Sequence, residues 1–117
     1  MCLILLSYKM HPDYRLILAA NRDEFYNRPT APLDYWADYS DVLAGRDLKG
    51  NGTWLGVTQS GRIAAITNYR DPAVHMENAP SRGILIRDFL TGNVSPERYL
   101  KAVRKMSQAY NGFNLIA

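Results

Sequence analysis

Residues 21–26, with the sequence Asn-Arg-Asp-Glu-Phe-Tyr, are the part of this chain best suited to chemistry. They place an amide, a guanidinium and two carboxylates directly behind the apolar run 16–20. A plain turn would more often use Gly, Pro, Asn or Ser for backbone reasons, and no glycine or proline follows until Pro29. Polar groups held at the end of a rigid strand are typical of binding and catalytic sites. The segment therefore predicts a functional site.

Cys2 is the second candidate, because it is the only cysteine and directly follows Met1. Once Met1 is removed, the thiol and a free α-amine belong to one residue, and the amine can act as the general base for its own nucleophile. The alternative is an inert apolar residue in the first strand, since free cysteines are often buried. Position alone favours this alternative.

Two strands position these candidates. The apolar runs 2–8 and 15–20 are joined by residues 9–14, where Pro12 and Asp13 favour a turn. Both runs are nearly continuous rather than alternating, so we expect a hairpin that is covered on both faces. In an antiparallel pair the end of the second strand lies near the start of the first. This pairing would bring residues 21–24 close to Cys2.

The expected catalytic set at this hairpin end is Cys2, Asn21, Arg22, Asp23 and Glu24. Arg22 would activate the thiol or hold a substrate carboxylate, and Asp23 or Glu24 would orient the α-ammonium group. An equally open alternative is a structural network of arginine and carboxylates that fastens the following loop.

A second polar strand end lies at residues 67–70. Asn68 would donate its side-chain amide to a developing oxyanion, or it is a turn residue before Pro72. We also expect contacts to the substrate from aromatic and basic neighbours of these two strand ends and from a tryptophan that forms core or pocket wall. These residues are Phe25, Tyr26, Trp54, Tyr69 and Arg70.

The remaining elements follow from local patterns. Residues 27–41 contain two prolines and several aromatic residues without a clear period, which predicts a long, ordered loop. Apolar runs predict strands at 42–44, 53–58 and 63–69, and residues 59–62 predict a hairpin turn.

Two helices are expected in the second half of the chain. The first covers 81–90, with Ser81 as its cap and Gly92 as its stop, and the second begins at Ser95 and ends before residue 111. An apolar strand over 113–117 completes a single domain, residues 1–117, of mixed α+β class with helices on a largely antiparallel sheet. Because such an edge strand is a liability, we expect the chain to be the N-terminal part of a longer protein.

Composition narrows the functional class. The 117 residues are 47% hydrophobic and 21% charged, which is typical of a globular domain, and the net charge of +3 is spread rather than clustered. We therefore expect no nucleic-acid partner. One cysteine cannot form an internal disulfide, and no segment has the length of a membrane span or the pattern of a signal peptide. These features predict a cytoplasmic protein without an integral membrane segment.

Metal binding has little support in the sequence. The two histidines, His11 and His75, have no Cys or His partner at ligand spacing, so we expect no metal site. Either histidine could ligate haem iron in principle, as could Met10 or Met76.

Several motifs together resemble one family. They are Met1-Cys2, the LAANRDEFY segment at 18–26, GTWLG at 52–56, AITNY at 65–69 and YNGFNL at 110–115. In this order they closely resemble the NRDE family, also called the transport and Golgi organisation protein 2 family. Members of that family are considerably longer than this chain, which agrees with an N-terminal portion.

The resemblance carries expectations about fold and activity. The family is similar to N-terminal nucleophile hydrolases, which are four-layer αββα sandwiches with two central antiparallel sheets, and this would make Cys2 the nucleophile of an amidohydrolase that cleaves non-peptide carbon–nitrogen bonds. Penicillin V acylases and bile-salt hydrolases share the Met-Cys start but carry Arg-Asn-x-Asp after the second strand. Residues 21–24 depart from that pattern, so either carboxylate could occupy the Asp position.

The same resemblance supports a rival function. The family is linked to Golgi and secretory organisation, to haem mobilisation, and to lipid and acyl-coenzyme A metabolism. The chain would then be a non-catalytic protein that binds and carries haem or an acyl lipid. In the catalytic case no cofactor is expected, and the partner is a small-molecule substrate.

Overall fold

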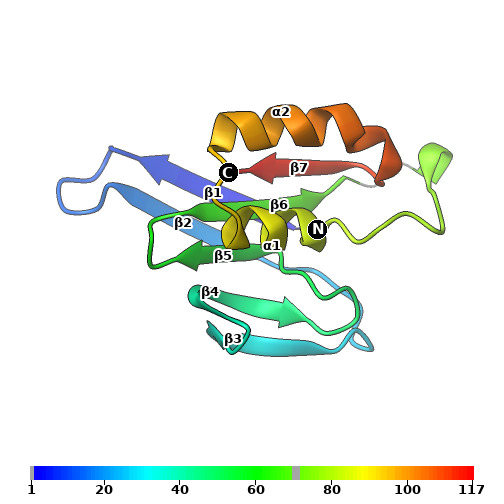
Figure 1. The fold of residues 1–117 in the computed structure, drawn as a ribbon, viewed down its shortest axis with the longest axis horizontal. Helices are drawn as coiled ribbons and strands as arrows, with labels where there is room; N and C mark the ends of the chain where they lie inside the picture. Colours follow the sequence, from blue (N-terminus) through cyan, green and yellow to red (C-terminus); the bar gives the residue numbers. More distant parts are fainter. Residues whose placement is uncertain (1, 70–71) are drawn as a thin grey trace.

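The computed structural model describes residues 2–69 and 72–117 (Figure 1). The strands are β1 Leu3–Tyr8, β2 Leu16–Asn21, β3 Thr30–Trp36, β4 Tyr39–Asp47, β5 Leu55–Thr58, β6 Ile63–Asn68 and β7 Phe113–Ile116. The helices are α1 Gly83–Thr91 and α2 Pro96–Met106, with short 3-10 turns at Pro72–Val74 and Ser107–Ala109.

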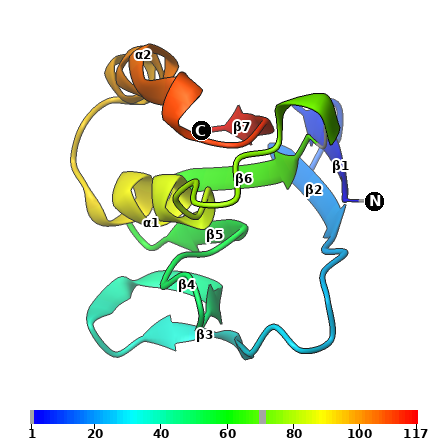
Figure 2. The same ribbon diagram turned by 90° about the vertical axis from the view of Figure 1, so that its right-hand side faces the viewer.

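These elements form three layers. The middle layer is a five-stranded antiparallel sheet of order β3-β4-β5-β6-β7. Helix α1 packs on β4, β5 and β6, and the β1–β2 hairpin lies on the opposite face of that sheet (Figures 1 and 2). Helix α2 runs beside β7 and contacts α1. The predicted α+β class with largely antiparallel sheets is confirmed.

The core lies between the five-stranded sheet and the helices. Small residues on the sheet let α1 approach closely: a Cβ placed on Gly56 would lie 2.6 Å from a methyl carbon of Leu90. Burial of each large apolar side chain stabilises the fold by roughly 1.5–3 kcal/mol. The buried cluster consists of Trp36, Val42, Ala44, Ala64, Ile66, Leu85, Ile86, Phe89, Leu90 and Val103.

Helix α2 begins as its sequence predicts, whereas α1 does not. The Ser95 hydroxyl accepts the Arg98 N–H at 3.5 Å, and Pro96 occupies the first turn. For α1, the predicted Ser81 cap is wrong, because the capping position is Arg82 and no side chain caps the helix. The start of α1 is instead fixed by tertiary contact, since the Thr53 N–H donates to the Gly83 carbonyl at 3.1 Å. Gly92 does follow the last turn of α1, as predicted.

The predicted loop over 27–41 is wrong. Residues 30–36 form β3, and β4 already begins at Tyr39. The sequence of β3 lacks the regular two-residue alternation of a strand, because register shifts between Ala31 and Asp34, and between Tyr35 and Trp36, interrupt it. The hairpin turn at 59–62 is confirmed, with Gly61 at φ +89°.

The β1–β2 hairpin pairs as predicted, with Leu3 opposite Asn21. Its expected burial on both faces is wrong for the described residues. Leu5 is 60% exposed and Ile17 is 42% exposed, whereas Ile4 and Leu18, which alternate with them, are partly buried. The hairpin therefore has two apolar faces. One is turned toward the five-stranded sheet, and the other is exposed at the surface.

Candidate functional site

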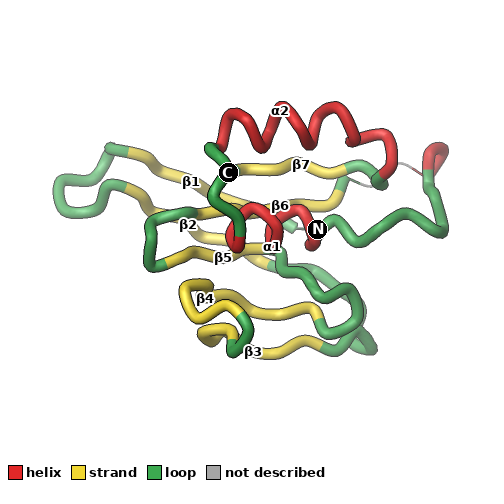
Figure 3. Tube along the Cα trace, viewed as in Figure 1, coloured by secondary structure: helices red, strands yellow, loops and turns green. Residues whose placement is uncertain are grey.

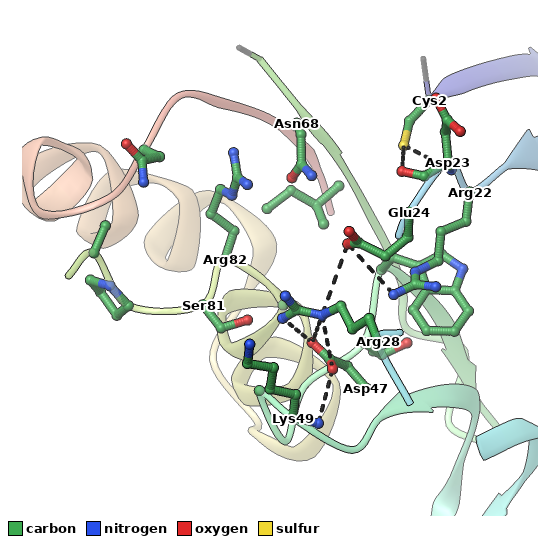
Figure 4. A pocket seen from close by; sticks show the side chains of 18 of the residues that line it. Cys2, Arg22, Asp23, Glu24, Arg28, Asp47, Lys49, Asn68, Ser81 and Arg82 are labelled. Atoms are coloured by element: carbon green, nitrogen blue, oxygen red, sulfur yellow. Dashed lines mark hydrogen bonds and ion pairs between the residues drawn. The ribbon is translucent and has the colours of Figure 1, made fainter. Parts of the chain in front are cut away.

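A cavity of about 390 Å³, called cavity 1, lies where the hairpin end meets the start of α1 (Figure 4). Cys2 and Asp23 stand on its hairpin side, and Lys49, Ser81 and Arg82 stand on the opposite side. Glu24 and Arg28 lie between the two sides, and Trp54 and Asn68 also line it. Six segments far apart in the sequence therefore meet around one polar space.

The Cys2 thiol contacts the backbone of Asp23. The Asp23 N–H donates to Cys2 Sγ at 3.3 Å, and the thiol lies 3.7 Å from the Asp23 carbonyl oxygen as a donor. Strand register brings these residues close, because one further step beyond the pairing of Leu3 with Asn21 would set Cys2 opposite Arg22, the residue before Asp23. The predicted proximity of Cys2 to residues 21–24 is confirmed.

A chain of charges crosses cavity 1 from the hairpin to β4. Arg22 stacks over the Trp54 ring, with 4.4 Å from its guanidinium carbon to the ring centroid, and lies 3.6 Å from a Glu24 oxygen. Glu24 also lies 3.9 Å from Arg28. Arg28 in turn contacts both oxygens of Asp47, at 2.7 and 3.2 Å. Each arginine is therefore held in place by a carboxylate.

Asp47 is the buried member of this chain. Burial alone would raise the pKa of its carboxyl group, but the hydrogen bond from Arg28, together with backbone amides, outweighs burial and holds that pKa below its ordinary value. The same hydrogen bond raises the pKa of Arg28. The pair is thus ionised on both sides, which anchors the loop after β2 to the end of β4.

A second, larger cavity of about 850 Å³, called cavity 2, adjoins cavity 1. Both cavities share Glu24, Arg28, Asn68, Arg82 and Asn111 as lining residues. The Asn68 side chain makes no hydrogen bond with any described residue, so its amide is available to a ligand in either cavity. Cavity 2 has a more apolar wall, which consists of Phe25, Tyr69, Val74, Met76 and Tyr110 beside His75.

The structure brings most of the predicted site residues together. Cys2, Arg22, Asp23, Glu24, Trp54 and Asn68 line cavity 1, and Phe25 and Tyr69 line cavity 2.

Two predicted residues lie elsewhere, and a third is not described. The Asn21 side-chain oxygen accepts the Leu3 N–H at 2.9 Å, and Asn21 lines neither cavity. Tyr26 is fully exposed and also lines neither. Arg70 lies outside the described residues.

Sequence reasoning missed several residues of the site. Arg28 stands four residues after Glu24, a spacing that suits an ion pair, and Asn111 belongs to a motif already noted above. Asp47, Lys49 and Arg82 had no local signal, because only the fold brings them to residues 22–28.

Two features are absent from the described ranges 2–69 and 72–117. Within them, no three His, Cys, Asp or Glu side chains gather closely enough to hold a metal ion. Neither helix in these ranges combines the length and apolar character needed to span a bilayer.

Known proteins are similar to this chain in sequence. The family model described as Transport and Golgi organisation 2 matches residues 1–117. The bovine Transport and Golgi organization protein 2 homolog is 47% identical over 124 residues, covering 100% of this chain and 45% of the relative. The human homolog is 46% identical with the same coverage, and the Drosophila melanogaster protein of that name is 31% identical over 129 residues. The chain thus spans 45% of the length of these relatives.

Proposed function

Because this chain belongs to the Transport and Golgi organisation 2 family, we propose that it is the N-terminal part of an N-terminal nucleophile hydrolase-like domain of that family. Its layers of helices, five-stranded sheet and hairpin support a four-layer αββα sandwich that the longer protein completes. The proposed reaction is hydrolysis of a non-peptide carbon–nitrogen amide bond by Cys2.

One observation carries this proposal: the thiol of Cys2 lies at a polar cavity and accepts a backbone N–H from Asp23 at 3.3 Å. This contact fixes the position of the sulfur at the cavity, as a nucleophile requires. Asn68 lines the same cavity and offers an amide donor to an oxyanion. An inert core cysteine would need neither feature.

The chemistry follows from these groups after removal of Met1. The α-amine of Cys2 takes the thiol proton, and the sulfur attacks the amide carbonyl carbon, so that a C–S bond forms. Asn68 stabilises the oxyanion through its side-chain amide. When the C–N bond breaks, the α-ammonium returns the proton to the leaving amine. Water then hydrolyses the thioester, which releases a carboxylic acid and restores the thiol.

Arg22 and the two carboxylates support this cycle. Arg22, held between Trp54 and Glu24, offers its charge to a substrate carboxylate. Asp23 would orient the new α-ammonium group.

The decisive experiment uses the full-length protein and its Cys2→Ala and Cys2→Ser variants. Intact-mass analysis reports whether Met1 is absent, and a thiol-reactive amide analogue should add one mass label at Cys2. A panel of N-acyl p-nitroanilides reports turnover, which both variants should lose at least 100-fold. Retained Met1 with an unlabelled Cys2 would overturn the catalytic proposal.

A second candidate function rests on cavity 2. Its size and apolar wall suit an acyl chain, and His75 and Met76 supply the two side-chain types that ligate haem iron. In this alternative the chain binds and carries haem or an acyl lipid, consistent with relatives whose names refer to transport and Golgi organisation.

Titration separates the two candidates. Haemin and palmitoyl-coenzyme A are added separately to full-length protein and to Cys2→Ala, and binding is followed by absorbance and calorimetry. A binding protein saturates equally with or without the thiol. Failure of both ligands to saturate either form would reject the carrier function.

A further inference from the structure

Helix α2 carries a row of basic side chains on its exposed side. Arg98, Lys101 and Lys105 stand three and four residues apart, so they share one face of the helix, and Arg104 lies beside them. All four side chains are exposed. In the sequence they are separated by other residues, and only the helix collects them on one face. These four residues, which extend roughly 10 Å along the helix axis, are here called the basic row.

No carboxylate neutralises the basic row. Among the residues that the structure describes, none forms an ion pair with these four side chains. Glu97 is the only acidic residue of α2, and it makes no ion pair with Lys101 although it stands four positions before it. Arg46, by contrast, is held by both oxygens of Asp38, at 2.6 and 2.7 Å. The charge of the basic row is therefore available to a partner.

The stability of α2 does not explain the whole row. Arg104 and Lys105 suit the last turn of a helix, where the helix dipole favours cations. Arg98 is the third residue after the Ser95 cap, where the dipole opposes a cation. A glutamate at that position would complete a capping box with Ser95. Arg98 thus places a positive charge where the helix itself favours a negative one.

An apolar groove of about 450 Å³ adjoins the basic row, between α2 and β7. Leu100, Val103, Phe113 and Leu115 form its apolar walls, and Arg104 lines it as well. Basic side chains beside apolar surface are typical of contact with an anionic bilayer, where charged headgroups lie next to hydrocarbon. Single-stranded nucleic acid would instead need aromatic side chains on which bases stack, and the basic row contains none.

The position of α2 leaves the basic row accessible to a flat surface. Figure 3 shows α2 along β7 at the top of the molecule, and it lies at the top in Figure 2 as well. The opposite side of the helix belongs to the core. Val103 is 4% exposed, and the Tyr99 hydroxyl donates to the Leu85 carbonyl at 2.7 Å. A bilayer can therefore meet the four charges without insertion of the helix.

From these features we propose that the basic row and the adjoining groove dock the protein on a bilayer surface that contains anionic phospholipid. The negative headgroups pair with the four cations, and the apolar walls of the groove contact the adjacent hydrocarbon boundary. This docking is independent of the proposed hydrolysis, because no residue of the basic row lines cavity 1 or cavity 2.

The experiment measures flotation of the full-length protein with lipid vesicles. Vesicles of phosphatidylcholine are compared with vesicles in which part of that lipid is replaced by phosphatidylserine. The protein should float with the anionic vesicles alone. Raising the salt concentration to about 1 M should release it, because screening then shortens the reach of surface charges to about 3 Å.

Arg98→Glu is the variant that separates docking from folding. It reverses one charge of the basic row and adds the carboxylate of a capping box, so α2 should be at least as stable as before. Each basic residue near an anionic surface contributes about fivefold to the partition coefficient, so this change of two charge units should lower it roughly 25-fold. Thermal unfolding verifies that the variant is folded.

Arg15→Glu is the matched control, because Arg15 is exposed directly before β2, lies outside α2 and gives the same change in net charge. It should lower the partition coefficient by no more than about twofold, since charges beyond a Debye length of the surface are screened. Equal losses in the two variants would overturn the inference, because net charge alone would then explain the binding.

Two other results would also overturn the inference. The first is absence of flotation with phosphatidylserine vesicles at low salt. The second is binding of polyuridylate or polyglutamate through Arg98 by a protein that leaves the vesicles unbound, which would assign the basic row to nucleic acid or to an acidic peptide. A protein that floats but shows no turnover rejects only the hydrolase, and an active protein that does not float rejects only the docking.

Discussion

At the scale of single residues, Asp47 holds cavity 1 together. Asp47 is 6% exposed. Its carboxylate receives Arg28 through both Nε and a terminal nitrogen, and it also accepts the Lys49 N–H at 3.1 Å. Removal of one partner leaves the other charge partly buried without compensation, which costs more than the pair itself contributes. Asp47 therefore matters for the shape of the site although it stands 45 positions from Cys2.

Asp47→Asn should lower the free energy of unfolding by about 2 kcal/mol, the range for hydrogen bonds to charged groups. The folded state holds the Asp47 pKa below its unfolded value. Its stabilisation is therefore complete above roughly pH 4 and is lost as pH falls through the folded pKa. Urea unfolding at several pH values should show a flatter acid dependence in the variant.

The control for Asp47→Asn is Asp38→Asn. Arg46 hydrogen-bonds Asp38 and lowers its pKa, but this pair lies on the surface, where solvent screens the interaction. Asp38→Asn should therefore destabilise the protein less. An equal loss in both variants would show that cavity 1 gains no special anchoring from Asp47.

At the scale of elements, the start of α1 is fixed by backbone packing rather than by a cap. A Cβ on Gly52 would lie 2.3 Å from the Gly83 carbonyl carbon. The two segments meet through main-chain atoms, which cannot move aside as a flexible side chain could. Ser81 and Arg82 line cavity 1 at the start of α1, and their positions depend on this close contact between the two backbones. The sequence signalled a cap at Ser81 because local patterns cannot show a contact between segments 31 residues apart.

Gly52→Ala should destabilise the fold by about 3 kcal/mol, because overpacking against backbone forces the helix away from the sheet. Gly61→Ala is the comparison: nothing lies within 4 Å of its Cβ, and only its φ of +89° opposes a side chain. That substitution should cost about 1 kcal/mol. Thermal unfolding of both variants measures the difference, and equal losses would contradict the packing argument.

Tyr99 joins the two helices and provides an alkaline signal. Its hydroxyl donates to the Leu85 carbonyl at 2.7 Å, and burial raises its pKa to about 12. Because the folded state favours the protonated phenol, this stabilisation is present below about pH 10 and is lost as pH rises toward the folded pKa. Absorbance titration near 295 nm should show a late phase close to pH 12 that Tyr99→Phe removes. If the late phase persisted in the Tyr99→Phe variant, it would belong to the titration of another tyrosine.

At the scale of the whole molecule, the sequence predicted what local patterns encode. It predicted the α+β class, the hairpin that brings residues 21–24 to Cys2, the Ser95 cap and most of the central strands. It missed β3, because bulges conceal its alternation, and it missed Asp47 and Arg82, because only the assembled sheet and helix bring them to the cavity. Tyr26 was grouped with its neighbours by sequence position, yet the chain turns it outward.

The apolar outer face of the hairpin should make the 117-residue chain self-associate, since contiguous exposed apolar surface favours contacts between molecules. Leu5→Lys, at the centre of that face, should lower the association measured by sedimentation at least tenfold. Leu33→Lys is the control, because Leu33 is 70% exposed on β3 and lies outside the hairpin. If both substitutions lowered self-association equally, the interface would not lie on the hairpin.

The hairpin that carries Cys2 is also the layer with the least burial. Segments with few buried apolar contacts open at a lower free energy than the core does. Separation of β1 from β2 would remove Asp23 from the sulfur while the five-stranded sheet stays intact. The contact between the thiol and Asp23 therefore reports the local opening equilibrium of these two strands, and any contact that covers their outer face shifts that equilibrium without touching the cavity.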